Sequence, residues 1–200
     1  MSFNPGRIDP TNEAFTISRK PLVAHWQTPG GAKLFTINVH FSSKGGSSST
    51  QGDARPPVNS PIQARINQFN ATAVSSLQAS PFGALNDRNA QSFIQTILAA
   101  DQQANIVLAG DFNEFIQTRA VFKPLTDILT SIDEAANVPE VERYSYVFDQ
   151  NSQQLDHVLI SNAVKERGVE FEHIHINTWT STKAGQISDH DPSVGQIRVC

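Results

Sequence analysis

The feature that most constrains the fold is the stretch Asn105-Ile-Val-Leu-Ala-Gly-Asp-Phe-Asn113. Its apolar run, residues 106–109, is bounded by polar and turn residues, which predicts a short buried strand. Asp111 and Asn113 are two residues apart, so their side chains point the same way if the extended backbone continues past Gly110. A carboxylate and an amide oxygen at a strand end suit a hard divalent cation and a phosphate. The same letters also fit a plain strand followed by an Asx turn.

Length and charge limit the functional classes. The 200 residues suffice for one domain or for part of a larger one. The net charge of −4 excludes a broadly basic surface for nucleic acid, so a phosphate ligand must be held locally. No apolar run of about 18 residues occurs, which predicts no membrane span. The N-terminal residues lack the basic start and apolar core of a signal peptide, and the single cysteine, Cys200, says little about compartment. Localisation therefore stays open.

Hydrophobic periodicity predicts a mixed α/β chain with antiparallel hairpins. Residues 1–18 and the acidic segment up to Glu142 are expected as loops, 42–60 as a flexible loop, and 79–86 as an insertion break at Ser80-Pro-Phe-Gly83. Helices are expected from about residue 61, over 86–100, and from Pro124 onward. Strands are expected at 21–26, 33–41, 143–148, 154–160, 169–176 and 192–199, besides the opening stretch. In the strand at 33–41, the side chains of Asn38 and His40 face outward.

Several polar residues lie at strand ends, where an apolar environment would not choose them. They are His40, Asp111, Asn113, Asp156, Asp189 and His190. Asp156 lies between Leu155 and an apolar run, so an unpaired carboxylate there would be costly. An imidazole is its natural partner, since such pairing raises the basicity of the histidine and fixes its tautomer, and His190 is the candidate. The plainer readings are an exposed strand histidine at 40, a turn cap at 156 and a loop at 189–190.

Other polar residues give weaker signals. His157, His173 and His175 are interpreted as ordinary strand residues, because a zinc pair at 173 and 175 has no third ligand at a suggestive spacing. The Gly45-Gly46 loop lacks the lysine and serine of a phosphate-binding P-loop. A nucleotide cradle is therefore not expected.

The order of the motifs is more specific than any one of them. It runs Arg19-Lys-Pro-Leu22, Asn38-Val-His-Phe41, Gly110-Asp-Phe-Asn113, Leu155-Asp-His157 and Ser188-Asp-His-Asp-Pro192. In this order the chain resembles the endonuclease/exonuclease/phosphatase superfamily, the DNase-I-like phosphodiesterases. It looks most like the extracellular nuclease-like proteins of fungi and bacteria.

The resemblance implies an α/β fold, the C-terminal part of a four-layer α-β-β-α sandwich with mostly antiparallel sheets. It implies a metal-dependent phosphoester hydrolase, most of all a nuclease that cleaves DNA or RNA by assisted attack of water. Asp111 would orient or activate the water, Asn113 would hold phosphate and metal, and His40 would stabilise the phosphate. Asp156 and His190 would form the hydrogen-bonded pair. Phosphatase and sphingomyelinase activities are alternatives within the same class.

The resemblance also implies a cofactor and a substrate site. The cofactor would be Mg²⁺, or Mn²⁺ or Ca²⁺ in its place, held by Asp189, Asp111 and Asn113. The partner would be nucleic acid or another phosphodiester, whose phosphate would be held by Arg19, Asn38 and Arg65. Arg88 is the alternative to Arg65, since two helical segments stand where the family usually has one.

One departure from the family pattern changes the expectation for activity. The family's domain is longer and begins with strands that carry a metal-binding asparagine and glutamate. We therefore expect this chain to correspond to the C-terminal portion, with open hydrophobic surface, low stability and weak or no activity on its own. A catalytically inactive remnant of the fold is the competing hypothesis. Cleavage of plasmid DNA by the 200-residue chain at the rate of a full-length relative would contradict the expectation.

Overall fold

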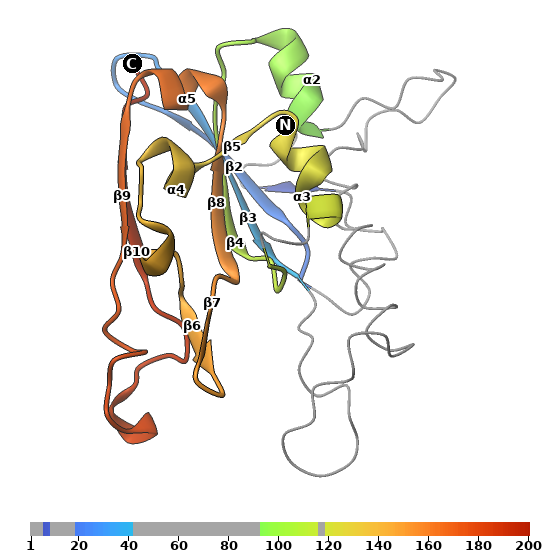
Figure 1. Cartoon of the computed structure of the whole chain (residues 1–200). Helices are drawn as coiled ribbons and strands as arrows, with labels where there is room; N and C mark the ends of the chain where they lie inside the picture. The colour runs from blue at the N-terminus through green and yellow to red at the C-terminus, as the bar shows by residue number, and fades with distance from the viewer. Residues whose placement is uncertain (1–5, 9–18, 42–92, 116–118) are drawn as a thin grey trace.

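The computed structural model describes residues 6–8, 19–41, 93–115 and 119–200, and its centre is a six-stranded sheet (Figure 1). The strand order is β1 (Gly6–Arg7), β2 (Leu22–Gln27), β3 (Lys33–His40), β4 (Asn105–Asp111), β8 (Asp156–Ile160) and β5 (Thr130–Ser131). Only the β3–β4 pair is parallel, and the other four pairs are antiparallel. The predicted mixed, mostly antiparallel α/β architecture is confirmed.

The remaining elements are short and surround this sheet. The helices are α2 (Phe93–Ala100), α3 (Arg119–Thr126), α4 (Ile132–Ala135) and α5 (Asn162–Glu166), with 3-10 turns at Glu140–Glu142 and Lys183–Gly185. Two antiparallel pairs form separate sheets: β6 (Tyr146–Phe148) with β7 (Asn151–Gln153), and β9 (Val169–His173) with β10 (Ser193–Ile197). No helix in the described part of the chain is long and apolar enough to cross a membrane.

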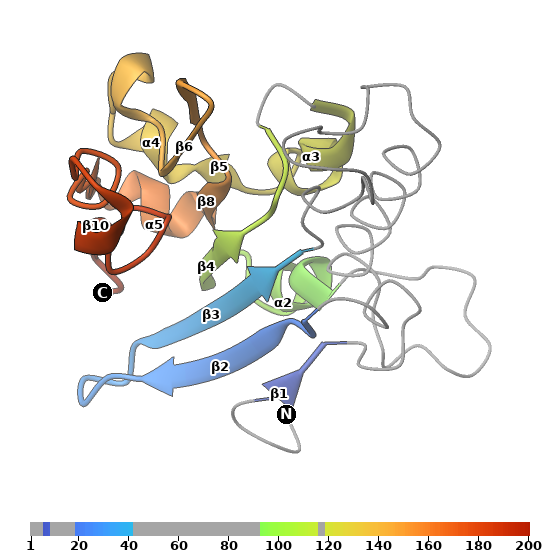
Figure 2. The ribbon, with the colours of Figure 1, turned by 90° about the horizontal axis from the view of Figure 1, so that it is seen from below.

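Helices α2 and α3 cover one face of the large sheet (Figures 1 and 2). The alternation in β3 turns Ile37 and Val39 into this core, as the period-2 pattern predicts, while Asn38 is exposed. The buried residues of the core include Ile37, Val39, Ile94, Ile106, Leu108, Phe112, Phe122, Leu125 and Leu159. Their burial against the helices fixes which way the end of each strand points.

The opposite face of the sheet packs against the β9–β10 pair through a second, smaller core (Figure 1). Ile132, Ile160 and Val164 are buried there, and Val169 and Phe171 of β9 pack against them. A helix layer, a large sheet and a second sheet therefore stack in the order that a sandwich requires.

The structure corrects several boundaries. The helix expected to begin at Pro124 spans Arg119–Thr126, with Pro124 inside it, where the proline removes one N–H from the helix ladder. The loop expected up to Glu142 contains α4 and a 3-10 turn. Strands β1, β5 and β7 have two or three residues each, too few for a periodic signal. The expected loop at 42–60, the helix from residue 61 and the break at 79–86 lie outside the described residues.

His157, interpreted from sequence as an ordinary strand residue, is buried in β8 at 3% exposure. Its Nε2 lies 2.9 Å from the carbonyl oxygen of Glu114, and its ring meets Phe112 and Phe122 edge-on. Burial lowers the pKa of His157 below its usual 6.5, against the opposing effect of that hydrogen bond. The folded chain therefore holds this imidazole neutral.

This burial predicts a pH-dependent stability. As pH falls below 6.5, the unfolded chain binds a proton that folded His157 resists, so the free energy of unfolding should decrease. We expect urea unfolding at about pH 7.5 and about pH 5.5 to show this loss in the natural chain and a smaller loss in His157→Gln. Equal losses in the two proteins would exclude His157 as the source.

Candidate active site

Three polar side chains form a row across the end of the large sheet. In the strand register, His40 of β3 is opposite Asp111 of β4, and Asp111 is opposite Asp156 of β8. Paired residues on neighbouring strands point to the same face of a sheet. Nε2 of His40 lies 3.5 Å from Oδ2 of Asp111. The sheet therefore brings together residues that lie far apart in the sequence.

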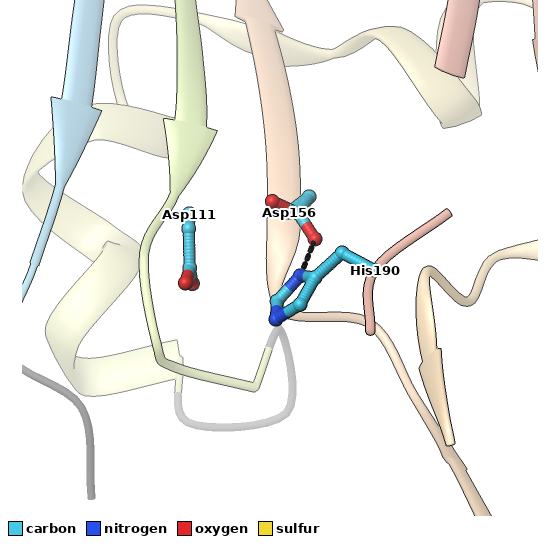
Figure 3. A group of neighbouring side chains, drawn as sticks. All are labelled: Asp111, Asp156 and His190. Atoms are coloured by element: carbon cyan, nitrogen blue, oxygen red, sulfur yellow. Dashed lines mark hydrogen bonds and ion pairs between the residues drawn. The ribbon is translucent and has the colours of Figure 1, made fainter. Parts of the chain in front are cut away.

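His190 completes the group from the segment that leads into β10. Its Nδ1 lies 2.5 Å from Oδ2 of Asp156, and Figure 3 shows this bond beside Asp111. The centre of the imidazole ring also lies 4.9 Å from the centre of the Tyr146 ring, and the backbones of these two residues form an isolated β-bridge. Because Nδ1 donates to the carboxylate, Nε2 is the nitrogen left to exchange a proton with a reactant.

The pairing changes the pKa of both partners. Burial works against ionisation of Asp156, but hydrogen bonds from His190 and from the Ser145 hydroxyl outweigh it, so the pKa of Asp156 is lowered. The bond to Asp156 raises the pKa of His190, although burial opposes this. For Asp111, burial is the largest effect and the nearby Asp156 adds to it, so its pKa is raised. The charge of Asp156 therefore affects the pKa of both Asp111 and His190.

The backbone after Asp111 differs from the extended form considered in the sequence analysis. Asn113 has φ +49°, and its backbone N–H donates to Oδ1 of Asp111 at 2.8 Å, which is an Asx turn. The side-chain amide of Asn113 also donates to Oδ2 of Asp111 at 2.9 Å and to the carbonyl oxygen of Phe41 at 3.1 Å. The turn still leaves both residues in the site, with Asn113 buried beside the carboxylate.

The other predicted site residues are more scattered. Asp189 is exposed and raises the pKa of His190 electrostatically, but it is not part of the compact group. Arg19 and Asn38 line an open pocket that also reaches His40. Arg65 and its alternative Arg88 lie outside the described residues.

The compact group has the composition of a cation site. One ligand atom each of Asp111, Asp156 and His190 lies within 4.8 Å of the others. Two carboxylates and an imidazole suit a divalent cation that keeps several waters. Asp156 and His190 already bond to each other, so Asp111 is the carboxylate of the group that this bond leaves available to a cation. The residues present therefore fit a bound divalent cation.

Ser145 is a site residue that the sequence analysis missed. It is fully buried, and its hydroxyl donates to Oδ2 of Asp156 at 2.5 Å while accepting from the backbone N–H of Asp156 at 3.3 Å. Its carbonyl oxygen accepts from the N–H of Asp191 at 2.7 Å. Ser145 thus holds both the carboxylate and the segment that carries His190. The only sequence signal was its place in the Tyr144-Ser-Tyr146 run.

Removing this hydroxyl should affect the chemistry more than the fold. Ser145→Ala takes one donor from Asp156, so the pKa of that carboxyl should rise and the acid limb of the pH–rate profile should move to higher pH. The lost charge-assisted bond predicts a rate about 10-fold lower. Ser152→Ala, at an exposed position of β7, is the control. An unchanged acid limb in Ser145→Ala would show that the hydroxyl only fills space.

Asp191 is a second residue without a predicted role. Its Oδ1 accepts the N–H groups of Asn177 and Thr178 at 2.8 and 2.9 Å, and its Oδ2 lies 3.0 Å from Nδ1 of His175. Asn177 in turn donates to the carbonyl oxygen of His190 at 2.7 Å. These bonds, with one from the Thr178 hydroxyl, anchor the segment around His190. Asp191 lies in the Ser188–Pro192 motif, which was its only signal.

Comparison with known proteins identifies the fold. No protein-family model matches the sequence, and no curated protein does. Solved structures match 88 to 96% of the chain with TM-scores of 0.52 to 0.57 at 11 to 16% identity. The chain covers only 47 to 65% of their length.

Three of these structures illustrate the range. A Bacteroides thetaiotaomicron endonuclease/exonuclease/phosphatase family protein matches at TM-score 0.54, with 14% identity over 89% of this chain and 53% of its own. A mannosyl-6-phosphatase from the same species matches at 0.53, with 14% identity over 90% and 57%. D. rerio TDP2 complexed with a single strand DNA product matches at 0.52, with 16% identity over 88% and 60%. The chain therefore has part of the endonuclease/exonuclease/phosphatase fold, as the resemblance predicted.

Proposed function

We propose that this chain carries the catalytic residues of a metal-dependent phosphoester hydrolase that acts on nucleic acid phosphodiesters. The observation that carries the proposal is the row of His40, Asp111 and Asp156 on adjacent strands, completed by the 2.5 Å bond from His190 to Asp156. A carboxylate–imidazole pair beside a second carboxylate is what general acid–base chemistry on water and phosphate requires.

Each residue has a role in this proposal. Asp111 orients the attacking water or takes its proton, and the Asp156–His190 pair moves a proton through Nε2 of His190. His40, 3.5 Å from Asp111, stabilises charge that develops on the phosphate. Asn113, held by its bonds to Asp111, positions the phosphate. A divalent cation would be held chiefly by Asp111, the member of the three-residue group that the Asp156–His190 bond does not engage, and would neutralise phosphate charge when bound. Asn113 and Asp189 are the further ligands that the resemblance implies.

Two solved structures bear on the substrate. D. rerio TDP2 is complexed with a single strand DNA product, which supports nucleic acid as the substrate class. The mannosyl-6-phosphatase keeps phosphomonoesters open as the alternative class within the same chemistry. The chain covers about half of each of these proteins, so their activities enter only as support for a proposal.

Because the chain is expected to be at most weakly active on its own, the test is single-turnover hydrolysis with the chain in excess over the substrate, which detects slow cleavage. We expect a labelled oligonucleotide to be cut with Mg²⁺ or Mn²⁺, the cut to stop in EDTA, and cleavage to return when the metal is restored. Release of phosphate from sugar phosphates should be slower than cleavage of the oligonucleotide. Cleavage that continues in EDTA, or no cleavage with either metal, would refute the proposed activity of this chain.

A further inference from the structure

Three cationic side chains line an open pocket beside the proposed active site. The pocket has a volume of about 470 Å³ and is lined by Arg7, Arg19, Lys20, Asn38, Val39 and His40. This volume lies in the range of pockets that hold small ligands or parts of larger ones. We call it the cation pocket. It shares His40 with the catalytic row, so a ligand in it lies next to the reacting group.

The strand register explains why these residues meet. Arg7 of β1 is opposite Leu22 of β2, and Leu22 is opposite Asn38 of β3. Ile8 is buried in the core at 1% exposure, so Arg7 faces the other side of the sheet, the side of Asn38 and His40. Arg19 and Lys20 lie just before β2 at the same end, separated from Leu22 by Pro21. Figure 2 shows β1, β2 and β3 side by side.

The side chains of the three cations are exposed. No hydrogen bond or ion pair engages the side chains of Arg7, Arg19 or Lys20 within the described chain. Other arginines are already bonded: Arg143 donates to the carbonyl oxygen of Val138 at 2.8 Å, and Arg167 to Oδ1 of Asn105 at 2.5 Å. The described residues that line the pocket include no carboxylate. In a chain of net charge −4, this is a local concentration of positive charge that suits an anion.

We propose that the cation pocket binds a backbone phosphate next to the one that is cleaved, so that the substrate is an oligonucleotide strand. This inference rests on the proposed hydrolase function and narrows its substrate. Arginine presents a planar fork that matches phosphate, and lysine adds a point charge. A sugar phosphate with one phosphate group would leave all three cations without an anion. Arg7 and Lys20 were not among the residues predicted to contact phosphate.

The experiment separates binding from hydrolysis. Binding of fluorescein-labelled single-stranded oligothymidylate is followed by anisotropy in EDTA over a range of salt concentrations. We expect the Arg7→Ala/Lys20→Ala double variant to bind about 10-fold more weakly at low salt, with the salt slope reduced by about 0.7 for each cation removed. Lys33→Ala, which removes an exposed lysine at the opposite end of β3, is the matched control and should bind like the natural chain.

Hydrolysis supplies the second measurement. With Mg²⁺, the double variant should lose cleavage of the oligonucleotide by about 10-fold more than hydrolysis of bis(p-nitrophenyl) phosphate, which has a single phosphate. Equal affinity and salt slope in the double variant and Lys33→Ala would overturn the cation pocket. If the double variant loses binding but the natural chain hydrolyses neither substrate, the cation pocket is upheld and the proposed hydrolase function is refuted. If the natural chain hydrolyses bis(p-nitrophenyl) phosphate but does not bind the oligothymidylate, the hydrolase function is upheld and the cation pocket is refuted.

Discussion

Asp111→Asn is expected to lower the single-turnover rate of phosphodiester cleavage about 1,000-fold while the chain stays folded. The amide keeps the size of the carboxylate but carries no charge for a cation and cannot accept a proton from water. Asp111 is held by the Asx turn to Asn113 and lies 3.5 Å from His40, so its charge is placed where the phosphate would react. Cleavage of a labelled oligonucleotide, with circular dichroism as the check on folding, measures the effect.

The same mechanism predicts that losses at two members of the group do not add. His190→Gln should also lower the single-turnover cleavage rate about 1,000-fold, because Asp156 then has no imidazole partner that can transfer the proton. The Asp111→Asn/His190→Gln double variant should be little slower than either single variant, since both residues act in the same step. Asp127→Asn is the control, because Asp127 is exposed on the surface and forms an ion pair with Lys123 at 2.7 Å, away from the proposed active site. Free energies of activation that add in the double variant would contradict a single catalytic unit.

Features that a short stretch of chain decides could be predicted from the sequence. The alternation of apolar and polar residues in β3 correctly assigns Ile37 to the core and Asn38 to the exposed face, because the two-residue period of a strand is a local property. The expected β2–β3 hairpin is also observed. The proximity of Asp156 and His190 was inferred differently, from the cost of burying an unpaired carboxylate, and the structure places the two side chains together.

Features decided by distant contacts could not be predicted. The Asx turn at Asn113 was one of two local alternatives, and nothing in the local sequence shows that its side-chain amide also reaches the carbonyl oxygen of Phe41, 72 residues away. Ser145 has an ordinary polar identity, and only the fold shows that its hydroxyl meets Asp156. The start of α3 before Pro124 was missed because a proline is favoured in the first turn of a helix, whereas Pro124 lies inside α3, where proline is disfavoured.

Gly110→Ala is expected to destabilise the chain by more than about 4 kcal/mol, which is close to the whole stability of many domains. Gly110 has φ +145°, and a Cβ there would lie 1.9 Å from the carbonyl oxygen of Val39 on the neighbouring strand. That atom belongs to the backbone of β3 and cannot turn aside as a side chain can. The alanine must push β4 away from β3, and urea unfolding or the loss of soluble protein would measure the result.

Gly31→Ala separates this clash from the cost of the backbone angle. Gly31 has φ +87° in the turn between β2 and β3, and a Cβ there meets nothing within 4 Å, so only about 1 kcal/mol of strain is expected. Similar losses for the two variants would exclude the close approach of β4 to β3 as the main requirement. If Gly110→Ala loses far more stability than Gly31→Ala, the glycine of the Gly110-Asp-Phe-Asn113 motif is required for the close approach of the two strands. It lets the two strands pack closely where they end, and this packing brings His40 and Asp111 within 3.5 Å of each other.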